Sequence, residues 1–227
     1  MERTISLNAV KNRHSVRQYL DKPIESEKIE ILQTEIQKIN SESGLNVQLF
    51  TNEPTTFNSL LAKYGKFKNV KNFFAIVGKN SSSLDQTAGY YGEKLVLLAQ
   101  SLGLNTCWVA LTFNKKNCPA KVEKGYRLAI VISLGYGENQ GKSHKQKPFE
   151  NFCKQEKSTL PDWFINGVEC AMLAPTAINQ QKFYFEHENG KVKAKTRRGP
   201  CSKIDLGIAK LHFELGANKD KDVWLND

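Results

Sequence analysis

The longest apolar pattern of the chain, over Leu84–Leu102, constrains the fold more than any other feature. Tyr91, Leu95 and Leu98 lie three and four residues apart, the spacing that places side chains on one face of an α-helix. Gly103 follows directly and favours the left-handed backbone that ends many helices. We therefore expect a long helix over 84–102 that packs at the centre of the core.

Short apolar runs on both sides of this helix predict strands. Phe73–Val77 is a continuous apolar run, which is typical of a strand buried on both faces, and Asn46–Phe50 precedes it. Strands are also expected over Thr106–Ala110 and Arg127–Leu134, the second closed by Gly135-Tyr136-Gly137. Helices and strands that alternate along a chain indicate an α/β or α+β fold.

The N-terminal part predicts two further helices. The first includes Ile5 and Val10 and ends within Arg13–Arg17, since no helix breaker lies before that segment. Ser26 is the expected N-cap of the second helix, which Gly44 ends. Its apolar residues recur every three or four positions: Ile29, Leu32, Ile36 and Ile39.

The C-terminal part predicts two helices. Pro161 suits the first turn of a helix that extends to Ala174, where Pro175 halts it. The last helix is expected to begin after Asp205 and to end at Gly216.

A hairpin is predicted between these helices. Asn189-Gly190 is typical of a type I′ turn, so Lys182–His187 and Lys191–Lys195 should pair as antiparallel strands. The alternating lysines of the second strand indicate an exposed face or edge.

Length and charge favour one globular unit. The 227 residues are predicted to form a single domain over 1–227, with an exposed, lysine-rich excursion at about 138–160. The net charge is +10, and many lysines lie in 142–157 and 191–203 without aromatic residues at regular spacing. Such runs predict solvated surface lysines, and no nucleic-acid partner is expected.

Membrane and metal sites are not expected from the sequence. No segment approaches the ~20 apolar residues that a membrane span requires, and Met1–Arg17 lacks the apolar run of a secretory signal. We therefore predict a cytoplasmic protein. The five cysteines are widely spaced and the four histidines show no ligand spacing, so no metal site is predicted.

Arg13, Ser15 and Arg17 form the first candidate site, with His14 between the first two. Two guanidinium groups and a hydroxyl at the end of a helix can bind a phosphate through charge-assisted hydrogen bonds, each worth about 1.5–3 kcal/mol. The alternative is a basic helix terminus that complements its own helix dipole.

The second candidate site is Ala174–Gln181, the turn between a predicted helix and a predicted strand. Its threonine hydroxyl and side-chain amides are groups that can recognise the polar edge of a heterocycle. The alternative is an ordinary turn that stops a helix.

Together, the two segments resemble the nitroreductase family. Arg13–Arg17 is similar to the family signature R-x-S-x-R, and Ala174–Gln181 is similar to its flavin-edge motif A-P-S-x-x-N-x-Q, with Lys182 where the family commonly has proline. The late position of the second motif matches a short nitroreductase-like subgroup. The likeness spans most of the chain and includes Tyr90–Ala110, Arg127–Gly137 and Asp205–Ala217.

The resemblance implies an α+β fold of the α/β-sandwich type, a central, mostly antiparallel sheet flanked by helices, and FMN as the cofactor. The residues implied to hold the FMN phosphate and ribityl chain are Arg13, His14, Ser15 and Arg17. The other cofactor-binding side chains that it implies are Pro175, Thr176, Ala177, Asn179 and Gln181. A backbone N–H is implied to face flavin N5 from one of Val109, Ala110, Leu111 or Thr112.

The resemblance also implies an oxidoreductase with ping-pong kinetics. NAD(P)H would give hydride to flavin N5 and leave, and a nitroaromatic, quinone or similar acceptor would then take the electrons. No catalytic side chain is required, because the flavin carries the chemistry; a cation near its N1 and C2 carbonyl would help, and Lys203 is one candidate. The alternative is a non-catalytic or regulatory flavin-binding protein. Both a homodimer and a self-complete monomer stay open.

Overall fold

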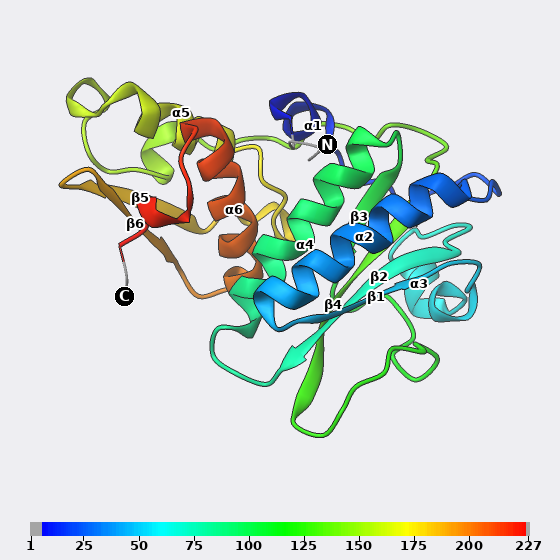
Figure 1. Cartoon of the computed structure of the whole chain (residues 1–227). Helices are drawn as coiled ribbons and strands as arrows, with labels where there is room; N and C mark the ends of the chain where they lie inside the picture. Colours follow the sequence, from blue (N-terminus) through cyan, green and yellow to red (C-terminus); the bar gives the residue numbers. More distant parts are fainter. Residues whose placement is uncertain (1–5, 226–227) are drawn as a thin grey trace.

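The computed structural model describes residues 6–225, and its centre is a four-stranded antiparallel sheet (Figure 1). The strand order is β1-β2-β4-β3, and every neighbouring pair is antiparallel. The predicted α+β fold with a mostly antiparallel sheet is therefore confirmed. The strands are β1 (Asn46–Phe50), β2 (Asn72–Lys79), β3 (Asn105–Val109) and β4 (Tyr126–Gly135).

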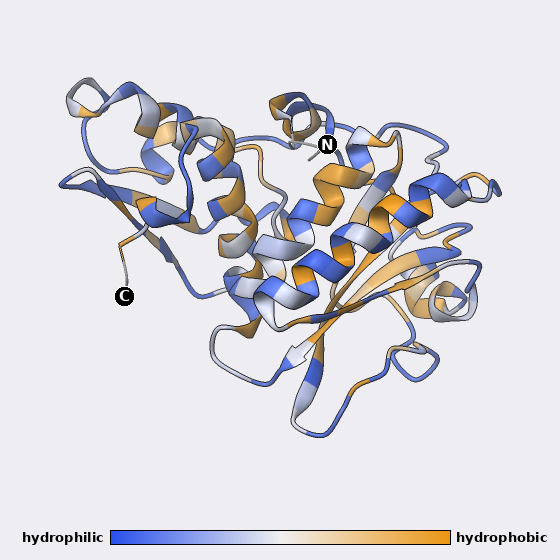
Figure 2. Cartoon of the chain, viewed as in Figure 1, coloured by the Kyte–Doolittle hydropathy of each residue, from blue (hydrophilic) through white to orange (hydrophobic). Residues whose placement is uncertain are grey.

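Helices α2 (Ser26–Ser43) and α4 (Leu84–Ser101) cover one face of this sheet (Figure 1). They bury Leu32, Leu95 and Ile76 in the same core cluster. Figure 2 shows hydrophobic residues concentrated along the strands of the main sheet and hydrophilic ones on many of the surrounding loops. The long helix expected over 84–102 is thus a core helix, as its apolar face predicts.

A short segment missed by the sequence analysis packs on the other face of the sheet. It contains the 3-10 helix η1 (Thr55–Phe57) and α3 (Leu60–Tyr64), and its Phe57 and Ala62 are buried against Phe73 of β2. A helix of five residues is too short to show periodicity, so the sequence carried no helical signal there.

The C-terminal part forms a second, smaller layer beside α4. It consists of α5 (Asp162–Ala171), the antiparallel hairpin β5 (Phe183–Glu188) and β6 (Lys191–Thr196), and α6 (Ser202–Ala217). Asn189 and Gly190 both have positive φ, at 49° and 76°, which confirms the predicted type I′ turn. The hairpin is separate from the main sheet and lies next to α6 (Figure 1).

Glycines let α4 and α6 approach closely. A Cβ atom on Gly89 would lie 2.1 Å from the carbonyl oxygen of Ile204, and one on Gly207 would lie 2.0 Å from that of Gln86. Both distances are far shorter than a van der Waals contact. The two backbones therefore touch at positions where a larger residue could not fit.

Several predicted boundaries differ from the structure. Glu25, and not Ser26, is the N-cap of α2; Ser26 is its first residue. The first helix, α1 (Leu7–Asn12), is capped by Ser6 and has Arg13 as its C-cap, so it ends one residue before the predicted range, and Ile5 lies outside the described residues. The last helix begins at Ser202, three residues before the predicted start at Asp205.

The excursion at 138–160 is not exposed throughout. It contains two 3-10 turns, η2 (Phe149–Asn151) and η3 (Lys157–Thr159). Phe152 is fully buried, and its carbonyl accepts a hydrogen bond from Phe185 N at 2.7 Å. Apolar burial and backbone pairing thus fix this lysine-rich segment along the β5 edge.

Candidate functional site

A cavity of about 340 Å³ lies where the two candidate segments meet. Five separate parts of the chain form its walls: the segment after α1, the end of β3, Ile130 of β4, the turn after α5 and the start of α6. Residues that line it are Ser15, Arg17, Cys107, Trp108, Ala110, Leu111, Ile130, Pro175, Thr176, Ala177, Ile178, Pro200, Cys201, Ile204, Asp205 and Ile208. Its volume lies within the usual range for small-molecule sites.

Pairing with β3 positions the first wall. Ser15 forms a parallel bridge with Thr106, and Val16 N donates to the Thr106 carbonyl at 3.0 Å. Side chains alternate along an extended backbone, so Val16 enters the core while Ser15 and Arg17 line the cavity. Arg17 is exposed and is the cationic side chain among the lining residues.

The turn after α5 has a strained backbone. Ile178, Asn179 and Gln181 have φ values of 48°, 55° and 46°, in the left-handed region that costs L-residues roughly 1–2 kcal/mol each. A β-branched residue such as Ile178 is a clear outlier there. Strain of this kind persists where surrounding contacts hold it, and it is concentrated at functional sites.

Two sets of hydrogen bonds hold this turn in place. On one side, the amide groups of Asn179 and Gln181 donate to the Lys145 carbonyl at 3.0 and 2.8 Å, and Lys147 N donates to Gln181 Oε1 at 3.0 Å. On the other side, Gln180 Nε2 donates to Asp205 Oδ2 at 2.6 Å. The excursion and α6 therefore clamp the turn between them.

Asp205 is the buried carboxylate of the cavity wall. It is 3% exposed, and it also accepts a hydrogen bond from Ala177 N at 3.0 Å. Burial raises the pKa of Asp205 to about 6, while the bonds from Gln180 and Ala177 lower it. Desolvation disfavours the charged form and outweighs these two donors.

A buried polar network lies behind the wall that contains Trp108. Glu93 on α4 accepts a hydrogen bond from Trp108 Nε1 at 3.0 Å, and His212 Nε2 lies 2.9 Å from its other oxygen. Arg13 Nε lies 3.7 Å from the same carboxylate, and no described atom accepts a hydrogen bond from it. Burial lowers the pKa of Arg13 and the charge of Glu93 raises it.

The structure brings seven of the predicted cofactor-binding residues into one cavity. They are Ser15, Arg17, Ala110, Leu111, Pro175, Thr176 and Ala177. Cys107 of β3 also reaches the lining, and burial raises the pKa of its thiol. Arg17 and Pro175, the nearest predicted members of the two segments, are 158 residues apart in the sequence, so only the fold shows that the segments converge.

The other predicted residues lie outside the lining. Arg13 faces Glu93, and His14 packs near Gly141, where a Cβ would lie 2.7 Å from that of His14. Val109 is a core residue on β3. The remaining four make local contacts. Thr112 packs against Gly65. The side-chain amides of Asn179 and Gln181 donate to the Lys145 carbonyl, and Lys203 Nζ donates to the Ser82 carbonyl.

Sequence reasoning missed the wall contributed by α6. Ile204, Asp205 and Ile208 line the cavity, but in the sequence they follow the three- and four-residue spacing of an ordinary amphipathic helix. The available signal was Asp205, an acidic residue within an apolar helical stretch. A buried acid commonly has a specific partner, which is a reason to examine it.

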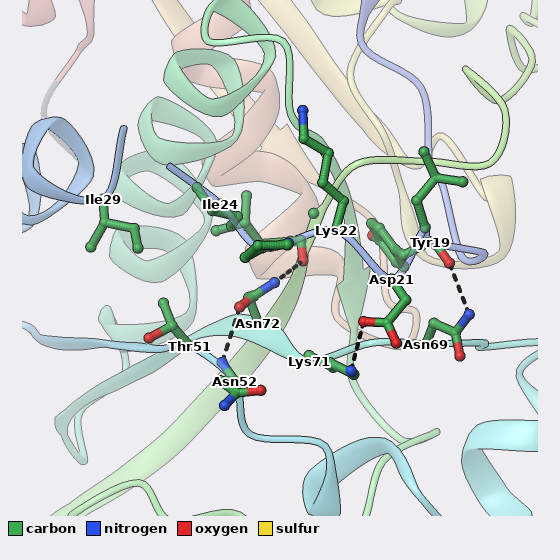
Figure 3. Close-up of a pocket in the computed structure, with 14 residues that line it drawn as sticks. Tyr19, Asp21, Lys22, Ile24, Ile29, Thr51, Asn52, Asn69, Lys71 and Asn72 are labelled. Atoms are coloured by element: carbon green, nitrogen blue, oxygen red, sulfur yellow. Dashed lines mark hydrogen bonds and ion pairs between the residues drawn. The ribbon is translucent and has the colours of Figure 1, made fainter. Parts of the chain in front are cut away.

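A second cavity, of about 350 Å³, lies at the C-terminal end of β4, where Leu134 and Gly135 line it (Figure 3). Its polar side chains bind one another and the main chain: Lys71 pairs with Asp21 at 2.7 Å, and Asn69 Nδ2 donates to the Tyr19 carbonyl at 3.2 Å. Asn72 accepts a hydrogen bond from Asn52 N at 3.1 Å. None of the predicted cofactor-binding residues lines this cavity.

Within the described residues 6–225, no helix is long and apolar enough to cross a membrane. In the same part of the chain, no cluster of three or more histidine, cysteine, aspartate or glutamate side chains could hold a metal ion.

Comparison with known proteins gives one family and a consistent fold. A family model described as "Putative TM nitroreductase" matches residues 6–217. The chain is similar to a Thermotoga maritima protein described as a "putative nitroreductase", with a TM-score of 0.67 and 21% identity, over 95% of this chain and 84% of that one. No curated protein sequence matched the chain.

Two further solved structures share the fold. One, from Desulfovibrio desulfuricans, is described as a "putative nitroreductase in complex with FMN"; its TM-score is 0.51 at 18% identity, over 66% of this chain and 95% of that one. The other, from Parabacteroides distasonis, is described as a "Putative NADH dehydrogenase/NAD(P)H nitroreductase" and has a TM-score of 0.51 at 21% identity, over 64% and 95%.

Proposed function

The chain belongs to the nitroreductase family whose model matches residues 6–217, and we propose that it is an FMN-dependent oxidoreductase. It would take electrons from NAD(P)H and pass them, by a ping-pong mechanism, to a nitroaromatic, quinone or similar acceptor. The observation that carries the proposal is the convergence of Ser15, Arg17, Ala110 and the Pro175–Ala177 turn in a single cavity.

The residues present fit a flavin. An isoalloxazine ring has two apolar faces and one polar edge, and the cavity offers Trp108, Ile130 and Pro175 as apolar surface beside the Arg17 guanidinium. An arginine that lines an apolar cavity can stabilise negative charge on a bound ring. Arg13 Nε, which lies 3.7 Å from Glu93 but makes no hydrogen bond in the described structure, adds a buried donor behind the wall that contains Trp108.

In this proposal the protein orients the cofactor and leaves one face open. Ser15 and Arg17 would hold the ribityl chain and the pyrimidine side, and Pro175, Thr176 and Ala177 would contact the ring. Bound FMN would supply the redox chemistry by accepting hydride from NAD(P)H and returning two electrons to the acceptor. Arg13 and His14 remain proposed phosphate ligands, and Asn179 and Gln181 would act by shaping the turn.

One chain supplies all five walls, so we favour the self-complete monomer over a site shared between two subunits. Residues before β1 and residues of α6 line the same cavity. The expected electron donor, NAD(P)H, is an intracellular metabolite, and the proposal keeps the cytoplasmic location that the N-terminal sequence predicts.

The visible absorption spectrum of the purified protein tests the proposal. We expect flavin bands, release of FMN on heating, and bleaching by NADPH or NADH under anaerobic conditions, followed by reoxidation on addition of a quinone. A yellow protein that NAD(P)H does not bleach would identify the non-catalytic flavin-binding alternative. A colourless protein that fails to take up added FMN would contradict both.

A further inference from the structure

We propose that Arg197 and Lys182, two cations on the outer face of the β5–β6 hairpin, bind the 2′-phosphate of NADPH and make NADPH the preferred electron donor over NADH. The inference rests on the proposed function for the reaction. It goes beyond that function by naming the donor and the residues that select it.

The open end of the hairpin borders the cavity. Lys182 follows the turn that contributes Ala177 and Ile178 to the lining, and Arg197 precedes Pro200, another lining residue, by three positions. Both cations lie outside the lining itself. The cavity of about 340 Å³ would already hold the flavin ring, so the adenosine half of a bound dinucleotide must lie on the surface around it. The hairpin supplies a basic part of that surface.

Strand register gathers cationic side chains on one face of the hairpin. Tyr184 pairs with Lys195 across β5 and β6. Arg197 N donates to the Lys182 carbonyl at 3.0 Å, which extends the same ladder towards the cavity. Residues two apart on a strand share a face, and the other face is buried through Phe183. The side chains of the outer face therefore include Lys182, Tyr184, Lys195 and Arg197.

Contacts orient the Arg197 guanidinium before any ligand binds. Its Cζ lies 5.6 Å from the centre of the Tyr184 ring, within the range of a cation–π interaction. Lys182 Nζ donates to the Arg198 carbonyl at 2.9 Å, which fixes the lysine beside the loop that follows β6. An ammonium group has three donors, so this bond leaves two for a ligand. Side chains ordered in advance lose less conformational entropy on binding.

The protein leaves the charge of these two cations uncompensated. Lys195, on the same face, has a carboxylate partner in Glu186 at 3.1 Å. Within residues 6–225, no carboxylate forms an ion pair with Arg197 or Lys182. A guanidinium fork next to an ammonium group matches the oxygens of a phosphate, which both can bind through charge-assisted hydrogen bonds.

The 2′-phosphate is the group that distinguishes the two donors. A phosphomonoester carries a charge of about −1.5 to −2 at pH 7, whereas NADH has a neutral hydroxyl at the same position. Hydrogen bonds to a charged acceptor are stronger than those to a neutral one. Since Arg197 is exposed, the preference for NADPH should also weaken as the salt concentration rises.

The test compares Arg197→Gln with Arg198→Gln in the FMN-loaded protein. Arg198 is also exposed and makes no cation–π contact with Tyr184 in the described structure, so its substitution removes the same charge as a matched control. We expect the wild type to have a higher kcat/KM for NADPH than for NADH, and Arg197→Gln to lower that ratio about tenfold, as for loss of one charge-assisted hydrogen bond. Arg198→Gln should change the ratio less than about twofold, because exposed charges without a direct contact are screened.

Binding gives a readout that needs no turnover. The probes are adenosine 2′,5′-bisphosphate and 5′-AMP, which lacks the 2′-phosphate. Calorimetric titration should give a lower Kd for the bisphosphate in the wild type, and Arg197→Gln should raise that Kd about tenfold. Lys182→Gln should shift it in the same direction, and Arg197→Lys, which keeps the charge but not the fork, should have an intermediate Kd.

Equal Kd values for the bisphosphate and 5′-AMP in the wild type would overturn the assignment. So would equal losses in Arg197→Gln and Arg198→Gln, because binding would then depend on total charge and not on the outer face of the hairpin. Failure of the proposed function is distinguishable: a protein that neither NADPH nor NADH reduces would still bind the bisphosphate more tightly than 5′-AMP, through Arg197.

Discussion

Asp205 shows how a single buried group can make stability depend on pH. Its pKa is raised by burial to about 6, above the unfolded value of 3.8, so the folded protein binds a proton more tightly than the unfolded chain. For such a group, stability falls as pH rises from about 4 to about 6. The Asp205 side chain nevertheless holds the turn after α5, because it accepts hydrogen bonds from Ala177 N and Gln180 Nε2.

We predict that Asp205→Asn removes this dependence. The free energy of unfolding of the wild type, relative to that of Asp205→Asn, should fall by about 3 kcal/mol between pH 3 and pH 7, because the pKa shift of about two units corresponds to about 1.4 kcal/mol per unit. Urea denaturation of both proteins at several pH values measures the difference. A difference that is constant across this range would contradict the assignment.

Arg17 supplies the positive charge of the cavity lining, and we predict that Arg17→Gln weakens FMN binding by about tenfold or more. A hydrogen bond to a charged group contributes about 1.5–3 kcal/mol, and glutamine keeps a donor without the charge. Titration of apoprotein with FMN, followed by flavin fluorescence, gives the Kd. Arg198→Gln, an exposed arginine outside the lining, is the control and should bind FMN as the wild type does.

Ser15 and Arg17 are predicted from the resemblance to the R-x-S-x-R signature, and their positions on either side of the buried Val16 follow from the extended backbone that pairs with β3. Asn179 and Gln181 differ, because their amides bind the carbonyl of Lys145, a residue in a segment expected to be exposed. That pairing depends on how the excursion folds back, which no periodicity encodes.

At the scale of elements, long apolar patterns gave accurate predictions and short ones did not. The helix expected over 84–102 is observed over Leu84–Ser101, since its apolar stripe covers five turns. The five-residue α3 had no comparable pattern. The start of α6 was misplaced because Cys201, with a φ of 53°, begins the helix without a side-chain cap that a sequence could reveal.

The contact between α4 and α6 is predicted to be intolerant of even one methyl group. Gly207→Ala should destabilise the protein by about 1–3 kcal/mol, because its Cβ would overlap the Gln86 carbonyl oxygen of α4. It should also weaken FMN binding, since Ile204, Asp205 and Ile208 of α6 line the cavity.

Thermal or urea unfolding measures the first effect, with Gln100→Ala on α4 as the control. That substitution lies away from the glycine contacts and should change stability by less than about 0.5 kcal/mol. Gly207→Ala with wild-type stability would show that the helices can separate without cost.

At the scale of the whole molecule, we propose a single domain in which each chain completes its own site. One core cluster includes Leu32 of α2, Ile132 of β4 and Phe213 of α6, so the N-terminal and C-terminal parts are packed together. Cavity walls from both parts are then fixed relative to one another by that core.

This predicts that two variants, each with its own cavity blocked, cannot complement each other when they are mixed. Ala110→Trp and Ala177→Trp fill the cavity from different walls, and each should lose FMN binding. A refolded mixture should stay without bound FMN, as measured by gel filtration with detection at the flavin wavelengths. Recovery of FMN in the mixture would show that walls are exchanged between subunits, as in a dimer with shared sites.

The residues that line the cavity are spread along the chain from Ser15 to Ile208. The complete cavity can therefore form only after α6 has been synthesised. A ribosome adds about 5–20 residues per second, so Trp108 and Leu111 emerge about five seconds or more before α6 arrives to enclose them. In the proposed function, the growing polypeptide passes this interval without FMN, and we expect the finished protein to acquire flavin only after release.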